Sequence, residues 1–284
     1  ASGEMTLFMA VPTIYAKLIE SWRRQPGTVR ESWSRGAADL RLMVSGSAAL
    51  PERVLHEWQE ITGHRLLERY GMSETGMILS NPLDGERVPG SVGAPLPGVE
   101  VRFMGGGEPS PEGGVQGELE VRGPAVFLEY WRREAETRAG FTSDGWFRTG
   151  DVAALRDGRY RMLGRTSTDI LKTGGYKVSA LEIEEVLREH PCIRECAVVG
   201  LPDEEWGQRV AVAVQLRLGA PSLALDELRA WGKERLAPYK VPTRLLLVDE
   251  LPRNTLGKVV KGEVVELFER KAKSRNRSSK LDEW

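Results

Sequence analysis

Apolar residues recur along the chain at two spacings, which predict alternating helices and strands. The segments after Pro12 and Pro51 have the helical spacing, and each begins with a proline in its first turn. The short apolar runs at residues 41–45 and 66–71 instead indicate buried strands that break at glycine. This order predicts a layered α/β unit. The expected apolar faces are Ile14, Leu18 and Ile19 in the first helix and Val54, Leu55, Trp58 and Ile61 in the second.

From Val99 onward the pattern changes to short strands. Strands are expected at residues 99–103 and 118–121, separated by a glycine-rich segment that is typical of a solvent loop. The dipeptide Asp157-Gly158 lies between two apolar runs and predicts a hairpin. Helices are then expected at 180–189, 223–236 and 259–271, with strands at 195–199, 210–216 and 245–248, which together form a second, smaller α/β domain.

Composition narrows the class of protein. A chain of 284 residues has room for about two domains. Its 40 basic and 41 acidic residues give a net charge of −1, which removes the broad electrostatic argument for nucleic-acid binding. No apolar run reaches the ~18 to 20 residues that a membrane span needs, so a soluble protein is expected. Two cysteines and three histidines argue against a disulfide framework or a metal centre built from these side chains.

Two clusters of small and polar residues follow predicted strands. Ser45, Gly46 and Ser47 leave backbone N–H groups at the start of a helix, which suits a flat or anionic ligand, although a tight turn explains them equally well. The segment 70–76 supplies an aromatic face, a glycine, a hydroxyl and a carboxylate able to hold Mg²⁺. For Ser73 and Glu74 alone, a serine-capped helix start is the alternative.

Three later clusters add to these. Asp151 follows a glycine turn, where its carboxylate could accept two ribose hydroxyls or simply belong to an ordinary turn. Residues 164–178 alternate fixed charges with glycines, which suits a hinge or a channel for a thiol. Lys258 lies on a glycine-flanked loop, where an ammonium can follow charge developing on a phosphate or carboxylate.

In this order and spacing, the five clusters resemble the adenylate-forming superfamily of acyl-CoA synthetases, luciferases and peptide-synthetase adenylation domains. The resemblance runs from about Phe8 to Phe268. Residues 45–50, 67–72, 89–93 and 172–182 are most similar to the malonyl-CoA synthetases. The implied architecture is the C-terminal part of a large AMP-binding domain at residues 1–163, a small mobile domain at 164–270 across a hinge, and a disordered polar tail at 271–284.

The resemblance implies two half-reactions. A carboxylate first attacks ATP to give an acyl-adenylate, and the thiol of CoA then displaces AMP. It assigns Glu74 to Mg²⁺, Lys258 to adenylation, Lys172 to the thioester step, Ser167 to the hinge, and Gly174 and Gly175 to the CoA channel. The superfamily usually has Thr at the position of Ser73, and Ser keeps the hydroxyl. The implied nucleotide-binding set is Ser45, Gly46, Ser47, Tyr70, Gly71, Ser73, Asp151, Arg165 and Lys258.

A dicarboxylic substrate needs a second anion site. Arg69, directly before Tyr70, is the candidate, because a guanidinium binds a carboxylate in bidentate fashion. The alternative is that Arg69 pairs with a nearby carboxylate such as Glu68 or Glu74. Met72 and Met77 are expected to line the acyl pocket, with core packing as an equal alternative.

The superfamily's glycine-rich phosphate loop does not occur in these 284 residues. We therefore expect that the sequence begins within the large domain and that this polypeptide alone is inactive or nearly so. A ligase for short or medium monocarboxylates, or a non-catalytic module that binds nucleotide or CoA, remains an alternative. A peptide-synthetase adenylation domain is disfavoured, because no carrier domain follows. The resemblance further implies small-molecule partners only (malonate or methylmalonate, ATP and CoA), a monomer and a mitochondrial location.

Overall fold

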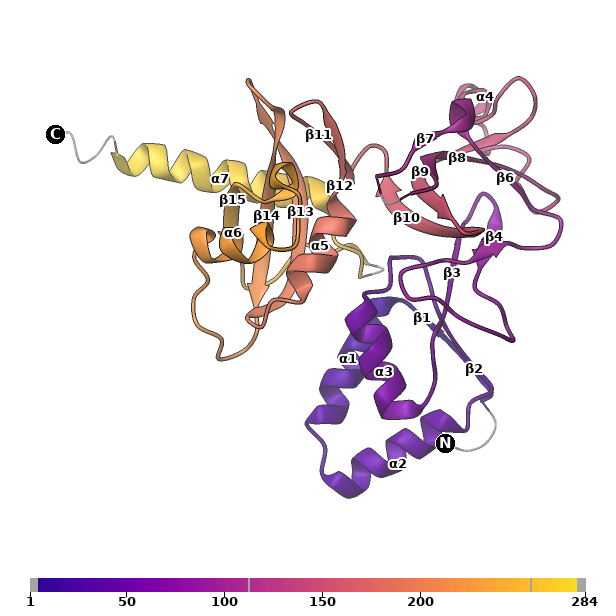
Figure 1. The fold of residues 1–284 in the computed structure, drawn as a ribbon, viewed down its shortest axis with the longest axis horizontal. Coiled ribbons are helices and arrows are strands. Elements are labelled where there is room, and N and C mark those ends of the chain that lie inside the picture. The colour runs from indigo at the N-terminus through magenta and orange to yellow at the C-terminus, as the bar shows by residue number, and fades with distance from the viewer. Residues whose placement is uncertain (1–4, 112, 256, 280–284) are drawn as a thin grey trace. The chain divides into compact units, whose positions relative to one another are not determined.

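The chain folds into two compact units. A computed structural model describes residues 5–111, 113–255 and 257–279. The first unit ends at Met162 and the second begins at Leu163, whereas the sequence placed the boundary between residues 163 and 164 (Figure 1). Each unit has its own apolar core, and both are of the predicted α/β class.

The N-terminal part of the first unit is a mixed sheet with helices packed against it (Figure 1). Tyr15 and Ile19 of the first helix pack on Val54, Leu55 and other residues of the third. The Tyr15 hydroxyl donates to the Val44 carbonyl over 2.8 Å, which ties the helix to the sheet. The elements are β1 (Leu7–Ala10), α1 (Pro12–Arg23), α2 (Gly27–Ala38), β2 (Leu42–Ser45), α3 (Glu52–Thr62), β3 (Leu67–Met72), β4 (Gly76–Ser80) and β5 (Ala94–Pro95); β1, β2 and β3 are parallel, and β4 and β5 continue the sheet antiparallel.

Two details of these helices differ from the sequence expectation. Ile14 is 40% exposed, because Tyr15 rather than Ile14 lies on the buried side of α1 together with Ile19. Helix α2 was not predicted, since none of its residues is buried and it has no apolar stripe to reveal it.

The rest of the first unit is an antiparallel sheet of order β10-β9-β8-β6, with β7 also paired to β8. The predicted hairpin is confirmed: Asp157 and Gly158 connect β9 to β10 with φ angles of 51° and 74°. Helix α4 was not predicted and buries no residue. The elements are β6 (Glu100–Phe103), the 3₁₀ turn η1 (Met104–Gly106), β7 (Glu108–Pro109), β8 (Val115–Arg122), α4 (Glu134–Gly140), β9 (Phe147–Arg156) and β10 (Arg159–Arg165).

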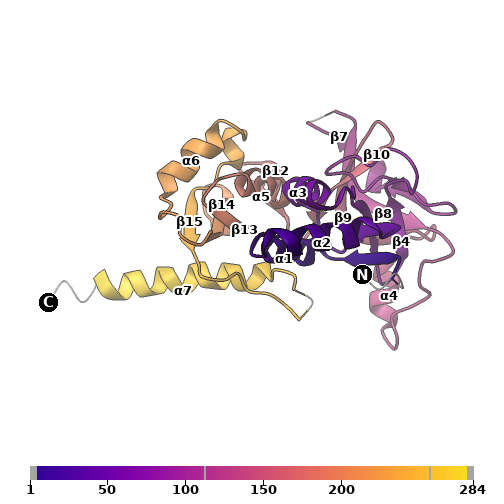
Figure 2. The same cartoon turned by 90° about the horizontal axis from the view of Figure 1, so that it is seen from below.

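The second unit is a three-layer α/β domain. Alternate residues of its two long strands face opposite sides of the sheet. Val198 and Val212 pack toward α5 and α6, whereas the smaller Ala197 and Ala211 pack toward α7. Figure 2 shows α6 and α7 on opposite sides of these strands. The elements are β11 (Ile170–Thr173), β12 (Tyr176–Ser179), α5 (Ala180–Arg188), β13 (Ile193–Asp203), β14 (Gly207–Leu216), α6 (Leu225–Lys233), η2 (Pro238–Lys240), β15 (Arg244–Leu247) and α7 (Lys261–Ser279).

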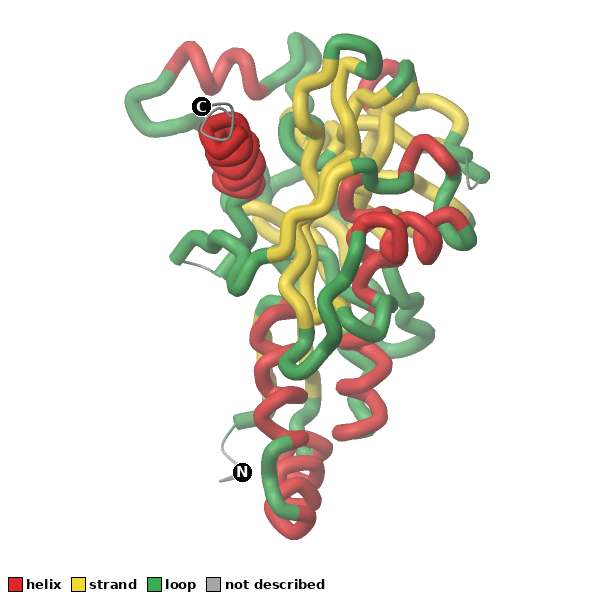
Figure 3. The backbone as a smooth tube through the Cα atoms, turned by 90° about the vertical axis from the view of Figure 1, so that its left-hand side faces the viewer, coloured by secondary structure: helices red, strands yellow, loops and turns green. Residues whose placement is uncertain are grey.

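The last helix is longer than the sequence suggested. The tail at 271–284 was expected to be disordered, but α7 continues to Ser279 as a long helix (Figure 1), which Figure 3 draws in red next to the grey trace at the C-terminus. The residues around the expected end are mostly Ala, Lys, Arg and Glu, which favour helix, and Arg270 pairs with Glu266 one turn earlier at 2.9 Å. Residues 280–284 lie outside the described part of the chain.

Candidate functional site

The segment after β2 combines buried small residues with a strained backbone. Ser45 is fully buried, and among the described residues its hydroxyl oxygen has no hydrogen-bond partner. Ser47 is exposed and has a φ of 66°, in the left-handed region that residues other than glycine seldom adopt. Such strain is concentrated at functional sites. The geometry is therefore compatible with the ligand-binding role expected for residues 45–47.

Gly46 and Arg69 lie against each other because β2 and β3 are parallel neighbours. The register pairs Ser45 with Glu68, which brings the following residue of each strand side by side. A Cβ atom placed on Gly46 would lie 2.8 Å from Cζ of Arg69 and 2.9 Å from its Nε. The absence of a side chain at Gly46 thus makes the space in which the guanidinium lies.

The guanidinium of Arg69 has no ion-pair partner among the described residues. Its Nε is buried without a hydrogen-bond partner, and no carboxylate in the described part of the chain forms an ion pair with it. Glu68 instead accepts a hydrogen bond from the Leu50 amide over 3.0 Å, and Glu74 accepts one from the Tyr130 hydroxyl over 3.0 Å. Neither alternative pairing of Arg69, with Glu68 or with Glu74, is found among the described residues.

Tyr70 and Asp151 are 81 positions apart in sequence and in contact in the fold. The Tyr70 hydroxyl donates to Oδ2 of Asp151 over 2.6 Å. The Asp151 amide donates to the Thr149 hydroxyl oxygen over 3.1 Å, and that hydroxyl donates to the Leu119 carbonyl over 2.9 Å. The two residues expected to contact adenine and ribose thus share one half-buried site, with the carboxylate held in place.

Glu74 is held by a loop that follows β8. Residues 73–75 form the turn between β3 and β4, so the alternative of a helix start at Ser73 is wrong. The Phe127 amide donates to the Glu74 carbonyl over 2.7 Å, while the Tyr130 hydroxyl donates to Oε1 of the side chain. The Tyr130 ring also packs on Phe127, with 4.6 Å between ring centroids. The half-buried carboxylate is therefore fixed at both its backbone and its side chain.

The remaining candidates of the first unit lie around the same hairpin. Ser73 is exposed at the turn, and Gly71 faces Met77 across the β3–β4 ladder. Met77 is 45% exposed and Met72 is half-buried, and neither belongs to an apolar core cluster of the described residues. Core packing therefore does not account for the two methionines.

In the second unit, Lys172, Gly174 and Gly175 lie on the β11–β12 hairpin. Both glycines have positive φ angles, 54° and 84°, as a two-residue hairpin turn of this kind requires. The Gly174 amide donates to the Trp206 carbonyl over 3.0 Å, and a Cβ on Gly174 would meet the Trp206 ring at 2.9 Å. Lys172 is exposed, and its amide donates to the Gln208 side chain over 2.7 Å. The glycines thus have a conformational reason to be present, independent of any channel.

Arg165 is the last residue of β10, and Ser167 lies in the exposed turn that follows it. Asp169 closes this turn: its amide donates to the Arg165 carbonyl over 2.8 Å, and its Oδ2 accepts the Arg165 amide over 2.9 Å. The expected hinge position therefore lies within a turn that is closed by hydrogen bonds.

Lys258 lies on a small loop closed by Asn254. The Lys258 amide donates to the Asn254 side chain over 2.9 Å, and the Asn254 amide donates to the Lys258 carbonyl over the same distance. Arg253 donates to the Gly257 carbonyl and pairs with Glu195 on β13, which anchors the loop to the sheet. The Lys258 side chain is exposed and has no ion-pair partner among the described residues.

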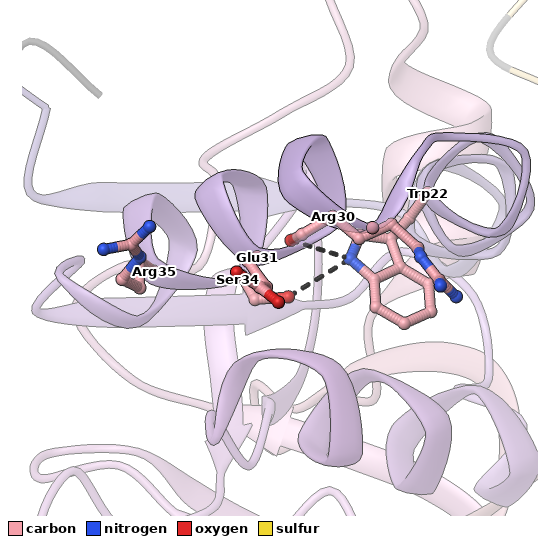
Figure 4. Close-up of a pocket in the computed structure, with 6 residues that line it drawn as sticks. Trp22, Arg30, Glu31, Ser34 and Arg35 are labelled. Carbon is pink, nitrogen blue, oxygen red and sulfur yellow. Dashed lines mark hydrogen bonds between the residues drawn. The ribbon is translucent and has the colours of Figure 1, made fainter.

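Other candidate features do not coincide with these residues. A shallow cleft of about 690 Å³ lies between α1 and α2 (Figure 4). There the Trp22 indole donates to the Arg30 carbonyl and the Ser34 hydroxyl, each over 3.1 Å. No predicted site residue lines it. Over the described ranges, no three His, Cys, Asp or Glu side chains gather to hold a metal, and no helix has the length and apolarity to cross a membrane.

Known proteins are similar to this chain in both sequence and fold. Residues 2–131 match the family described as AMP-binding enzyme, and residues 182–258 match its C-terminal domain. The chain is 53% identical over 289 aligned positions to "Malonate–CoA ligase ACSF3, mitochondrial" of Xenopus laevis, covering 93% of this chain and 50% of that protein. The chain belongs to the AMP-binding enzyme family.

Solved structures of AMP-binding enzymes agree with this membership. ATP-bound MatB from Rhodopseudomonas palustris matches with a TM-score of 0.82 and 39% identity, covering 93% of this chain and 51% of that one. A malonyl-CoA ligase with methylmalonyl-CoA and AMP bound matches with a TM-score of 0.52 and 43% identity, covering 87% and 53%. The predicted architecture of large-domain elements followed by a small domain is confirmed. The chain spans about half the length of the relatives it matches.

Sequence reasoning missed three residues that hold the side chain or the backbone of a candidate residue in place. Tyr130 orients Glu74, Thr149 holds the Asp151 amide, and Asn254 holds the Lys258 amide. Asn254 and Thr149 lie within five residues of the groups they hold, so turn chemistry could have suggested them. Tyr130 is 56 positions from Glu74, and no local signal connects the two.

Proposed function

We propose that this protein acts as an AMP-forming acid–thiol ligase, which activates malonate with ATP and transfers the malonyl group to CoA. The observation that carries the proposal is the Arg69 guanidinium, which lies in the space beside Gly46 with a buried Nε and no carboxylate partner among the described residues. The Arg69 side chain is half-buried, and a partly desolvated cation is stabilised when a ligand supplies an anion. Malonate keeps a second carboxylate while the first reacts, and a guanidinium can bind it through two parallel hydrogen bonds.

In this proposal the nucleotide binds over Tyr70 and Asp151. The Tyr70 ring offers a flat apolar face to adenine, and the Asp151 carboxylate, oriented by Tyr70 and Thr149, accepts ribose hydroxyls. Arg165 supplements the ribose contacts. The backbone of residues 45–47 and of Gly71, with the Ser73 hydroxyl, contacts the base and the phosphates. Met72 and Met77 line the acyl pocket beside Arg69.

Mg²⁺ is assigned to Glu74. This ion keeps several waters and takes only one or two protein carboxylates together with substrate phosphates. A single half-buried carboxylate, oriented by the Tyr130 hydroxyl, fits that requirement without a three-ligand cluster. When bound, the ion supplies positive charge that offsets the charge on the ATP phosphates. The contribution of the chain is the Glu74 carboxylate, whose Oε1 is held in a fixed direction by the Tyr130 hydroxyl.

Lys258 stabilises the charge that develops while the carboxylate displaces pyrophosphate. Its exposed ammonium and the Asn254 clamp on its amide suit a side chain that reaches toward a ligand. For the second half-reaction, rotation at Ser167 brings the hairpin of Lys172, Gly174 and Gly175 to the adenylate, where the glycine turn leaves room for a thin pantetheine arm.

Methylmalonate is a further acid that this site would accept, since its extra methyl leaves both carboxylates in place.

We also place the protein in mitochondria, because the Xenopus laevis relative is named mitochondrial. A fluorescent fusion of the full-length gene product that remains outside mitochondria would contradict this assignment.

The decisive test is Arg69→Ala in the full-length gene product, assayed by pyrophosphate–ATP exchange. Removing one partner of a desolvated charge pair costs about 2–5 kcal/mol, so kcat/KM for malonate should fall by a factor of roughly 30 to several thousand. Exchange with butyrate, which lacks the second carboxylate, should stay within about threefold of the parent protein. Arg69→Lys keeps the charge but loses the planar guanidinium, so its kcat/KM for malonate should lie between those of Arg69→Ala and the parent protein.

Two results would contradict the proposal. Equal losses with malonate and butyrate would show that Arg69 supports the fold or the nucleotide rather than the distal carboxylate. A parent protein whose kcat/KM for butyrate equals or exceeds its kcat/KM for malonate would favour a monocarboxylate ligase. Binding of AMP or CoA in titration calorimetry, combined with no pyrophosphate–ATP exchange by the full-length gene product with any acid, would favour a module that binds nucleotide or CoA without turnover.

A further inference from the structure

Lys261 places a buried cation between two parts of the second unit. It is the first residue of α7, and its Nζ lies 2.6 Å from Oδ1 of Asp169 and 2.9 Å from Oε1 of Glu184. The Lys261 and Glu184 side chains are only 13% and 4% exposed. Removing one partner of such a buried pair is strongly destabilising, because it leaves an uncompensated charge.

Asp169 connects this cation to the turn that contains the predicted hinge. We call residues 165–169 the hinge turn. While Oδ1 of Asp169 faces Lys261, its Oδ2 accepts the Arg165 amide over 2.9 Å and the Thr168 hydroxyl over 3.3 Å. One carboxylate therefore closes the hinge turn and ties it to the start of α7.

On its other side, Lys261 continues directly from the loop of Lys258. We call residues 253–255 and 257–260, the described part of this segment, the lysine loop. This loop is closed by the two hydrogen bonds between Asn254 and Lys258, and by the Val260 amide, which donates to the Pro252 carbonyl over 2.9 Å. Lys261 is thus separated from Lys258 by two residues of a closed loop.

Glu184 anchors the whole arrangement to the sheet. Its Oε1 also accepts the Val198 amide of β13 over 2.8 Å, and its Oε2 pairs with Arg188 at 3.0 Å. Burial by itself would lower the pKa of Lys261, but the carboxylates of Glu184 and Asp169 outweigh it and raise that pKa above its ordinary value. Lys261 therefore stays charged throughout the physiological pH range.

We propose that Lys261 is a positioning residue that joins the lysine loop to Asp169, the residue of the hinge turn that follows Ser167 and carries the ion pair, so that Lys258 moves as one body with the chain beyond the hinge. The role of Lys258 in adenylation rests on the proposed function, whereas the rigid link is a property of the second unit alone. Without the ammonium, the two segments keep their own local hydrogen bonds but lose the link between them.

Hydrogen exchange of the 284-residue chain tests the link without any activity. In Lys261→Met, exchange of both the lysine loop and the hinge turn should accelerate by about tenfold or more, as expected for local opening, while the central strand β14 keeps its protection. The matched control is Lys240→Met. Lys240 is 15% exposed and pairs with Glu182, two residues before Glu184 on α5, and it forms no ion pair with either segment among the described residues. It should leave both segments unchanged.

If Lys261→Met does not fold, Asp169→Asn removes the charge on the hinge side while keeping a side chain that can close the turn, and the same exchange pattern is expected. Acceleration of only one segment, of neither, or of the whole second unit would overturn the proposal.

A second measurement separates this proposal from the ligase assignment. In the full-length gene product, Lys261→Met should lower pyrophosphate–ATP exchange about tenfold with an unchanged KM for malonate, and Lys261→Arg should restore most of it. Thioester formation from supplied malonyl-adenylate should change by less than about threefold. Equal losses in the two half-reactions would overturn the positioning role. Coupled exchange in a protein without ligase activity would retain the rigid link and reject the proposed function.

Discussion

The substitution Gly46→Ala tests the recognition of malonate without touching the guanidinium itself. A Cβ at this position would lie 2.8 Å from Cζ of Arg69 and 2.9 Å from both Nε and Nη1. Ordinary contacts need about 3.5–4.0 Å, so the guanidinium must move by roughly 0.7–1.2 Å. It is the far end of a flexible side chain, and it can move without disturbing the strands.

A displacement of about 1 Å at a reacting group or its clamp can cost on the order of a hundredfold in rate. We therefore expect kcat/KM for malonate in the full-length gene product to fall about 100-fold, equivalent to about 2.7 kcal/mol of transition-state stabilisation. Exchange with butyrate should change little. The free energy of unfolding should not fall, because Gly46 is not among the glycines with positive φ. At such a position alanine lowers the conformational entropy of the unfolded chain, which stabilises the fold by about 0.4–1 kcal/mol.

The assay is pyrophosphate–ATP exchange with each acid, combined with a urea titration of the 284-residue chain. Gly27→Ala is the matched control, because that glycine also has no positive φ and its Cβ would meet nothing within 4 Å. If Gly46→Ala folds normally and keeps malonate kcat/KM within twofold, the placement of Arg69 beside Gly46 does not govern recognition. Parallel losses with both acids would refute the reasoning as well.

Two further predictions concern single side chains. Tyr130→Phe removes the hydrogen-bond donor to Glu74, so the Mg²⁺ concentration for half-maximal pyrophosphate–ATP exchange should rise up to about fivefold, with the malonate KM unchanged. A fivefold change is the effect of losing a hydrogen bond worth about 1 kcal/mol. An unchanged Mg²⁺ dependence would show that this contact does not orient Glu74. Burial raises the pKa of the Cys196 thiol to about 12, so at pH 8 a thiol reagent should label Cys192 rapidly and Cys196 only on unfolding; equal labelling of the native protein would contradict the buried position.

Local patterns were sufficient for most of the fold. The hairpin at Asp157-Gly158 and the strands that end near Ser45 and Tyr70 depend on neighbouring residues only, and they could be predicted. Helix α2 could not, because none of its residues is fully buried and its sequence has no apolar stripe. The continuation of α7 beyond residue 270 was missed for a related reason: a polar segment without a buried face resembles a frayed tail until its helix-forming composition is considered.

The two carboxylates considered as partners of Arg69, Glu68 and Glu74, show what neighbouring positions in the sequence can and cannot decide. Successive side chains of a strand point to opposite faces, so Glu68 could have been excluded as its partner from the predicted strand alone. Glu74 could not, because its side chain is held by Tyr130, which approaches from a loop beyond β8. The order of five motifs was enough to indicate the family, since each motif is local.

By itself, the sequence determined the order of the elements and the residue types that carry the chemistry, because periodicity, turn residues and motif spacing act over a few positions. Only the tertiary structure decided which of those residues meet. The contacts of Tyr70 with Asp151 and of Lys261 with Asp169 join residues 81 and 92 positions apart. Contacts at such separations form when strands and helices pack, and packing depends on the whole core of each unit rather than on any segment of it.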